Sequence, residues 1–172
     1  HKAFSVAMKQ GMVQANPCDA AELPKAQHKE IKPLTDAEIP LFLEAIESNP
    51  LKNAYALCLF AGLREGECLG LSWDQVNFET QRITVSQQLQ KEKCKNAKYY
   101  IAPTTKSGKP REIQPPDIAF QYLKAERRRQ TENQLAAGPL WSNPDNLVFT
   151  DGFGKHISIM TFYKHFKRIA AS

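Results

Sequence analysis

An arginine and a glutamate three residues apart stand at the end of the most apolar run of the chain. The run covers residues 51–60 (LKNAYALCLF), and Arg64 and Glu67 follow it in the stretch AGLREGECLGLSW. At this spacing on a helix the two side chains share a face, so the carboxylate can orient the guanidinium. An oriented guanidinium is a rigid set of donors that suits the oxygens of a phosphate. The pattern predicts an anion-binding Arg64 supported by Glu67.

The apolar run must position this pair. It is apolar on almost every side, which favours a buried helix, and Gly62 then supplies the left-handed backbone of a helix stop. A second short helix beginning at Leu63 places Arg64 in its first turn. We expect Arg64 to be mostly buried and bonded to Glu67, because an unpaired buried charge is strongly destabilising. The alternative is a solvated Arg64 that pairs with Glu67 at a helix start and binds no ligand.

The same stretch resembles a known family. GLREGE is followed by an apolar series, and together they are similar to the first arginine box of the tyrosine recombinases, the phage integrase family. The members of the apolar series are Leu69, Leu71, Trp73, Val76 and Phe78. The resemblance is greatest to integrases of phages and conjugative transposons. It implies a mixed α/β fold, mainly helical, with a small antiparallel sheet.

The resemblance also implies a chemistry. Tyrosine recombinases cut DNA with a tyrosine that forms a 3′ phosphotyrosyl link, and they use no metal or other cofactor. Two arginines, a histidine, a histidine or tryptophan and a β-hairpin lysine assist. Arg64 takes the place of the first arginine, Glu67 that of the acidic residue supporting it, and Lys106 in TTKSGKPREI that of the lysine, which protonates the leaving 5′ oxygen. Lys109 is the alternative lysine, and a solvated turn lysine is the ordinary role of either.

The second arginine box of the family is a histidine followed three residues later by an arginine. His165 and Arg168 have that spacing, but Lys167 and Ile169 stand where the box carries a leucine and a second polar ring. We interpret them as part of the helix that leads up to the box. The five tyrosines, at positions 55, 99, 100, 122 and 163, all precede the expected nucleophile. We therefore expect a truncated catalytic domain that is inactive alone.

Charge is spread unevenly along the chain. The net charge is +5, yet residues 1–80 carry seven basic and eleven acidic side chains, whereas residues 81–172 carry sixteen and seven. Such asymmetry favours a polyanion partner, and the resemblance makes it double-stranded DNA, on which the full-length protein self-associates. Between positions 91 and 111 seven basic residues accompany one acidic residue. We expect Lys91, Lys109 and Arg111 in this ribbon to contact the phosphate backbone.

The order of segments suggests three parts. Residues 1–15 form an amphipathic helix that we interpret as the tail of a preceding core-binding domain, and residues 16–33 resemble a linker. Residues 34–172 are then the N-terminal part of the catalytic domain. Its first helix starts with a capping box of Thr35 and Glu38, and Pro40 is tolerated only if the helix begins near it.

Beyond position 78 the apolar period changes from helical to alternating. The pattern predicts strands at residues 82–85, 98–102 and 110–113, with residues 106–109 turning between the last two. A helix starting at Asp117 follows. We expect its far end, residues 126–134, to be too polar to pack and therefore solvated.

Several classes of protein are disfavoured. The four cysteines form no CxxC pair and the four histidines lack the spacing of metal ligands. No apolar run approaches the ~20 residues of a membrane helix. We expect a cytoplasmic, metal-free protein of one globular core. Three functions stay open: a site-specific DNA recombinase, a non-catalytic DNA-binding or partner-docking module, and a protein in which Arg64 and Glu67 are only a buried ion pair.

Overall fold

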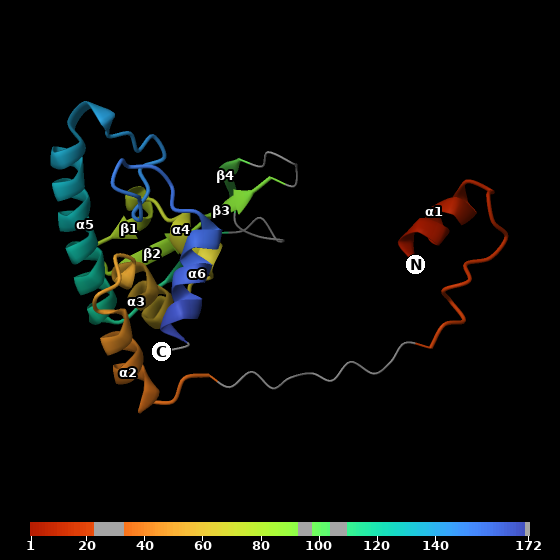
Figure 1. Cartoon of the computed structure of the whole chain (residues 1–172), viewed down its shortest axis with the longest axis horizontal. Coiled ribbons are helices and arrows are strands. Elements are labelled where there is room, and N and C mark those ends of the chain that lie inside the picture. Colours follow the sequence, from red (N-terminus) through yellow and green to blue (C-terminus); the bar gives the residue numbers. More distant parts are fainter. Residues whose placement is uncertain (23–32, 93–97, 104–109, 171–172) are drawn as a thin grey trace. The chain divides into compact units, whose positions relative to one another are not determined.

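The computed structural model of the chain describes residues 1–22, 33–92, 98–103 and 110–170 (Figure 1). It divides into two compact units, His1–Pro33 and Leu34–Ser172. The first unit carries α1 (Lys2–Lys9), which has no buried residue and ends before Met12. The division falls where we expected the catalytic domain to start, and the identity of the first unit stays a prediction.

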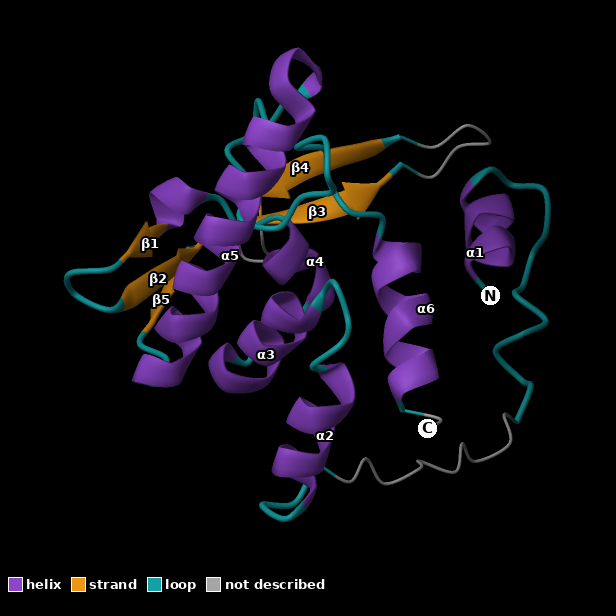
Figure 2. Cartoon of the chain, turned by 60° about the vertical axis from the view of Figure 1, so that its left-hand side comes forward, coloured by secondary structure: helices purple, strands orange, loops and turns teal. Residues whose placement is uncertain are grey.

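The second unit is built around one buried helix. Its helices are α2 (Glu38–Ile46), α3 (Lys52–Ala61), α4 (Glu65–Leu69), α5 (Asp117–Ala137) and α6 (Ile159–Ile169). Figures 1 and 2 both show α3 between α5 and α6. Residues 53–57 of α3 are buried on all sides, which confirms the prediction from the apolar run. Helix α3 ends as predicted at Gly62, whose φ is 61° and whose N–H donates to the Cys58 carbonyl.

Helix α2 tolerates Pro40 because the helix begins only two residues before it. The Glu38 carboxylate accepts hydrogen bonds from the backbone N–H and the hydroxyl of Thr35, at 2.7 and 2.8 Å. Regular helix begins at Glu38, so Pro40 lies in the first turn, where backbone N–H groups have no partner within the helix. The proline therefore removes no helical hydrogen bond.

Two small antiparallel sheets lie beside the helices. One has the order β1-β2-β5, from β1 (Val76–Asn77), β2 (Arg82–Val85) and β5 (Arg111–Ile113), and the other pairs β3 (Gln87–Lys91) with β4 (Tyr99–Pro103). Short 3-10 turns stand at Trp73–Gln75 and Gly138–Leu140. The three predicted strands are present within a residue of their expected bounds.

The predicted turn at residues 106–109 lies outside the described residues, and the strands on either side of it, expected to pair with each other, pair with different partners. Strand β4 pairs with β3, and β5 pairs with β2, with Val85 opposite Arg111. Because β3 follows β2 after a single residue, the run 82–91 offers successive partners to β4 and then to β5. Strand β3 was not predicted, since four of its five residues are glutamine or lysine.

The polar end of α5 is not solvated throughout, contrary to expectation. Glu126 is 1% exposed and Gln130 is buried too. The Glu126 carboxylate accepts from Asn53 of α3 at 2.8 Å and from Arg129 at 3.0 Å. Gln130 donates to the Leu147 carbonyl and accepts from the indole N–H of Trp73. Asn53 and Trp73 lie 73 and 57 positions away from their partners in the chain, so hydrogen bonds offset a burial that the sequence alone disfavoured.

Aromatic packing fixes α6 on α3. The Tyr55 and Phe162 rings lie 4.4 Å apart, and the Tyr55 hydroxyl donates to the Phe162 carbonyl at 2.8 Å. Phe166 lies 6.3 Å from Phe42 of α2. Residues 147–149 are buried before the loop that leads to α6, as predicted. The framework thus fixes α4, which carries the candidate site, between α3, α6 and β3.

Candidate active site

Arg64 lies at the surface, which corrects the prediction that it is mostly buried. Its side chain is 78% exposed. The left-handed Gly62 turns the chain, and Arg64 then has extended backbone (φ −69°, ψ 154°) as the residue just before α4. A side chain at this position projects beyond the helix end rather than onto its buried face. The predicted bond survives, because the Arg64 Nη1 donates to Glu67 Oε1 at 3.1 Å.

Glu67 is the buried member of the pair. Its side chain is 2% exposed, and its two oxygens accept four hydrogen bonds. Two come from Arg64, through the backbone N–H at 3.0 Å and the guanidinium. The other two come from Arg111. The hydrogen bonds from Arg111 are the main cause that lowers the pKa of the Glu67 carboxyl to about 2, against the opposing effect of burial.

Arg111 binds Glu67 more fully than Arg64 does. Its two terminal nitrogens donate one to each carboxylate oxygen, at 2.8 and 2.7 Å, across 44 positions of sequence. Glu67 in turn raises the pKa of the Arg111 guanidinium. From the sequence we predicted Arg111 as a DNA contact and did not predict this pairing. The one signal for it was that Glu67 stands among apolar residues and must have a buried counter-charge.

Of the three lysines predicted from the sequence as site residues, one lies among the described residues. Lys106 and Lys109 lie outside the described residues. Lys91 ends β3, is exposed, and has its ammonium 5.9 Å from the centre of the Tyr99 ring. Tyr99 links the β3–β4 ribbon to the start of α6, because its hydroxyl lies 2.8 Å from the Ser158 hydroxyl. The ribbon is therefore fixed to the helical framework at this point.

Helix α4 is seated directly on the backbone of β3. A methyl group added at Gly70 would lie 2.6 Å from the carbonyl carbon of Gln88, and one added at Gly66 would lie 3.0 Å from the Leu89 carbonyl oxygen. Neither glycine has a positive φ, so both serve to allow close approach. Arg64 and the β3–β4 ribbon are thereby held in one rigid arrangement.

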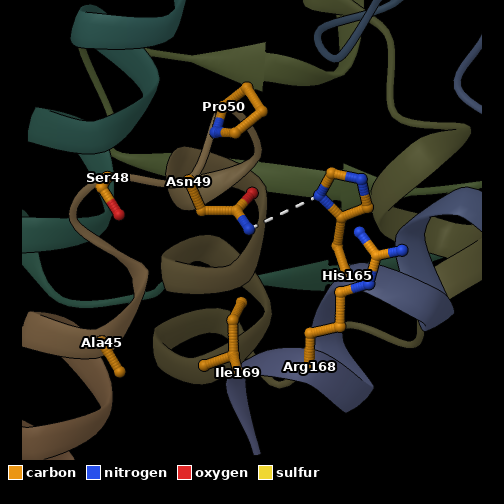
Figure 3. A pocket seen from close by; sticks show the side chains of 7 residues that line it. All are labelled: Ala45, Ser48, Asn49, Pro50, His165, Arg168 and Ile169. Atoms are coloured by element: carbon orange, nitrogen blue, oxygen red, sulfur yellow. Dashed lines mark hydrogen bonds between the residues drawn. The ribbon is translucent and has the colours of Figure 1, made fainter. Parts of the chain in front are cut away.

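His165 and Arg168 lie in a different place from this cluster. They line a pocket of about 350 Å³ between α6 and the α2–α3 connection (Figure 3). His165 Nδ1 lies 3.5 Å from the Asn49 amide nitrogen, and Figure 3 shows the two side chains facing each other. Neither Arg64 nor Glu67 lines this pocket. Both residues lie on α6, as expected, and the interpretation that this helix leads up to the second arginine box stays a prediction.

The described residues contain neither a metal-binding cluster nor a membrane-spanning helix. No group of three or more histidine, cysteine, aspartate or glutamate side chains there could hold a metal ion. No helix in the same part of the chain has the length and apolar character needed to cross a membrane.

Residues 32–172 match the model of the phage integrase family. The chain is 30% identical over 181 residues to a "Tyrosine recombinase XerC-like" protein of Caldanaerobacter subterraneus subsp. tengcongensis, covering 96% of this chain and 46% of that protein. It is 30% identical over 94 residues to an "Integrase" of Saccharopolyspora erythraea, covering 55% of this chain and 22% of the relative.

Among solved structures, the chain is similar to the Tn1549 transposon integrase in complex with transposon right end DNA. The TM-score is 0.75 at 25% identity, and the match covers 98% of this chain and 53% of that one. The chain thus spans less than half the length of the curated relatives it matches and about half of the solved integrase. Because the family model covers most of its residues, from 32 to 172, the chain belongs to the phage integrase family.

Proposed function

We propose that this chain is part of a tyrosine recombinase that carries out site-specific recombination and integration of double-stranded DNA. Family membership, the XerC-like relative and the DNA-bound integrase support this. The observation that carries it is the placement of Arg64, which is 78% exposed yet tied to a carboxylate that is 2% exposed. A guanidinium fixed at its base and open at its outer face is suited to a phosphate.

The proposed reaction divides roles among few groups. A tyrosine hydroxyl gives up its proton to water as its oxygen attacks the scissile phosphorus, the P–O bond to the 5′ oxygen breaks, and a 3′ phosphotyrosyl link forms. Arg64 stabilises the charge on the pentacoordinate phosphorus, Glu67 supports Arg64, and Lys106 gives its proton to the departing 5′ oxygen. No metal or cofactor enters this scheme, in which the cation that stabilises charge is the fixed guanidinium.

None of the tyrosines of this chain is assigned as the nucleophile. Tyr55 is buried, its hydroxyl donates to a backbone carbonyl, and burial raises its pKa to about 12. The hydroxyl of Tyr99 is engaged by Ser158 and that of Tyr100 by Gln90. Tyr163 is half exposed, with the Lys167 ammonium 5.7 Å from its ring centre, and it lies on α6, the helix that we expect to precede the second box.

The DNA surface is proposed on the basic segment that begins at Lys91, within the basic half of the chain. Lys91 at the end of β3 is exposed, and Lys91 and Lys109 are assigned to phosphates. Self-association on DNA and action in the cytoplasm, where the DNA substrate lies, are part of the same proposal. The alternative, a module that only docks on DNA or a partner, shares this basic surface and differs in having no strand cleavage.

Cleavage separates the two functions. A suicide substrate nicked near the exchange site is incubated with protein and analysed for a covalent adduct on a denaturing gel. We expect no adduct from residues 1–172 alone, and an adduct from a longer protein in which these residues are followed by the second arginine box and the nucleophilic tyrosine. Changing Arg64→Ala in that longer protein should abolish it. An adduct formed by residues 1–172 and lost on Tyr163→Phe would overturn the assignment of the nucleophile.

A further inference from the structure

We propose that Arg111 is a positioning residue, which acts through Glu67 to hold the Arg64 guanidinium outward for a DNA phosphate. The inference rests on the proposed function of Arg64. It replaces the sequence prediction that Arg111 itself binds DNA, and it assigns different roles to two arginines that share one carboxylate.

The two arginines form different hydrogen bonds with Glu67. Arg111 spans the Glu67 carboxylate with one terminal nitrogen on each oxygen, at 2.8 and 2.7 Å. Arg64 places a single guanidinium nitrogen on Oε1, at the longer distance of 3.1 Å. Paired parallel hydrogen bonds of this kind fix geometry as well as charge. Glu67 is therefore held chiefly by Arg111, and it needs only one hydrogen bond from the Arg64 side chain.

The side chains of Arg64 and Arg111 also differ in their exposure to solvent. The Arg64 side chain is 78% exposed, whereas that of Arg111 is 38% exposed and has two of its three guanidinium nitrogens on Glu67. Arg64 is thus the arginine that is open to an incoming phosphate. Arg111 comes from β5, and it ties that strand to the residue that supports Arg64.

The role of Arg111 follows from what its loss would do. The donors that reach Glu67 in the described part of the chain belong to Arg64 and Arg111. Without Arg111, a carboxylate that is 2% exposed would keep Arg64 as its remaining donor. A buried charge without a full set of partners is costly, so Arg64 would fold inward onto both oxygens. It would then no longer present its guanidinium to DNA.

A double-mutant cycle tests this dependence on Arg64. Affinity for a duplex oligonucleotide at low salt is measured for Arg64→Ala, Arg111→Met and the double variant. We expect each single change to lower the affinity about 10-fold, the loss typical of a hydrogen bond to a charged group. The double variant should bind no more weakly than Arg64→Ala, because Arg111 acts through Arg64. Losses that multiply in the double variant would show a direct contact and overturn the proposal.

The matched control is Arg82→Met. Arg82 lies on β2, next to β5, and pairs at the surface with Glu112, where both side chains are about half exposed. Arg82→Met removes the same charge as Arg111→Met without affecting a bond to Glu67, so we expect less than a twofold change in DNA affinity. A loss as large as that of Arg111→Met would mean that net charge alone is responsible, and the positioning role would be wrong.

A second measurement observes Arg64 without DNA. In the ¹⁵N-labelled protein, the Arg64 Nε–Hε resonance should shift in Arg111→Met, and its exchange with water should slow as the group folds inward. Arg111→Lys keeps the charge without the fork and should give an intermediate shift; it carries the test if Arg111→Met fails to fold. An unchanged resonance in a folded variant overturns the proposal. A shifted resonance with no effect of Arg64→Ala on DNA affinity supports the positioning role and rejects the proposed function of Arg64.

Discussion

At the scale of the residue, the site depends on a carboxylate in an unusual place. Glu67 is 2% exposed and lies beside Cys68 and Leu69, which are fully buried. A buried ion pair is often no more stabilising than apolar residues of the same size, so stability alone does not account for it. What Glu67 provides is orientation, since it fixes the base of Arg64 while the outer face of that guanidinium stays open.

The pKa of Glu67 gives a prediction about acid stability. Its value is lowered from 4.5 to about 2 in the folded protein, so its stabilising effect is present above pH 4.5 and is lost as the pH falls toward 2. Glu67→Gln should therefore lower the free energy of unfolding by up to about 3 kcal/mol at neutral pH, and much less near pH 3. Urea unfolding of both proteins across this range measures the difference. A difference that stays constant with pH would mean that Glu67 is not ionised against its arginines.

At the scale of the element, the contact between α4 and β3 carries the arrangement. Gly70 has a φ of −96°, which any residue can adopt, yet the backbone of Gln88 leaves no space for a methyl group. Gly70→Ala should therefore cost about 1–3 kcal/mol through overpacking and displace the β3–β4 ribbon from α4. Unfolding by denaturant measures the loss, and amide hydrogen exchange at Leu89 and Gln90 reports the displacement.

Gly152→Ala is the control for this change. A methyl group added at Gly152 would have no atom within contact distance, and Gly152 has no positive φ. The free energy of unfolding of Gly152→Ala should therefore stay within about 0.5 kcal/mol of that of the parent protein. Equal effects of the two substitutions, or a Gly70→Ala protein with unchanged exchange in β3, would argue against a rigid contact between the ribbon and the helix that follows Arg64.

At the scale of the whole molecule, the sequence predicted what local signals specify. The buried α3, its stop at Gly62 and strand β2 were all predicted correctly, because apolar runs and glycine act over a few residues. The glutamine-rich β3 was missed because its stability comes from pairing with β4 and from packing under α4, which its composition does not show.

Long-range hydrogen bonds account for the remaining differences. The partners Glu67 and Arg111 are 44 residues apart, and Asn53 and Glu126 are 73 apart, so no spacing rule could find them. The burial of Arg64 was predicted wrongly for a related reason. The sequence indicated that Arg64 and Glu67 form an ion pair with a buried member. Only the turn at Gly62 decides which of the two side chains faces solvent.

The distribution of charge over the chain gives the last prediction. Residues 81–172 carry nine more basic than acidic side chains, whereas residues 1–80 carry an excess of four acidic ones. Residues 1–172 should therefore bind duplex DNA weakly and with little sequence preference, and the affinity should fall steeply as salt releases the phosphate contacts.

Lys91→Gln should reduce the slope of log affinity against log salt by about 0.9, the value for one phosphate contact. Lys52→Gln, which removes a lysine paired with Glu47 in the acidic half, should leave the slope unchanged. Titrations of labelled duplex at several salt concentrations measure both slopes. An affinity independent of salt, or equal changes in the two variants, would contradict a DNA surface on the basic half of the chain.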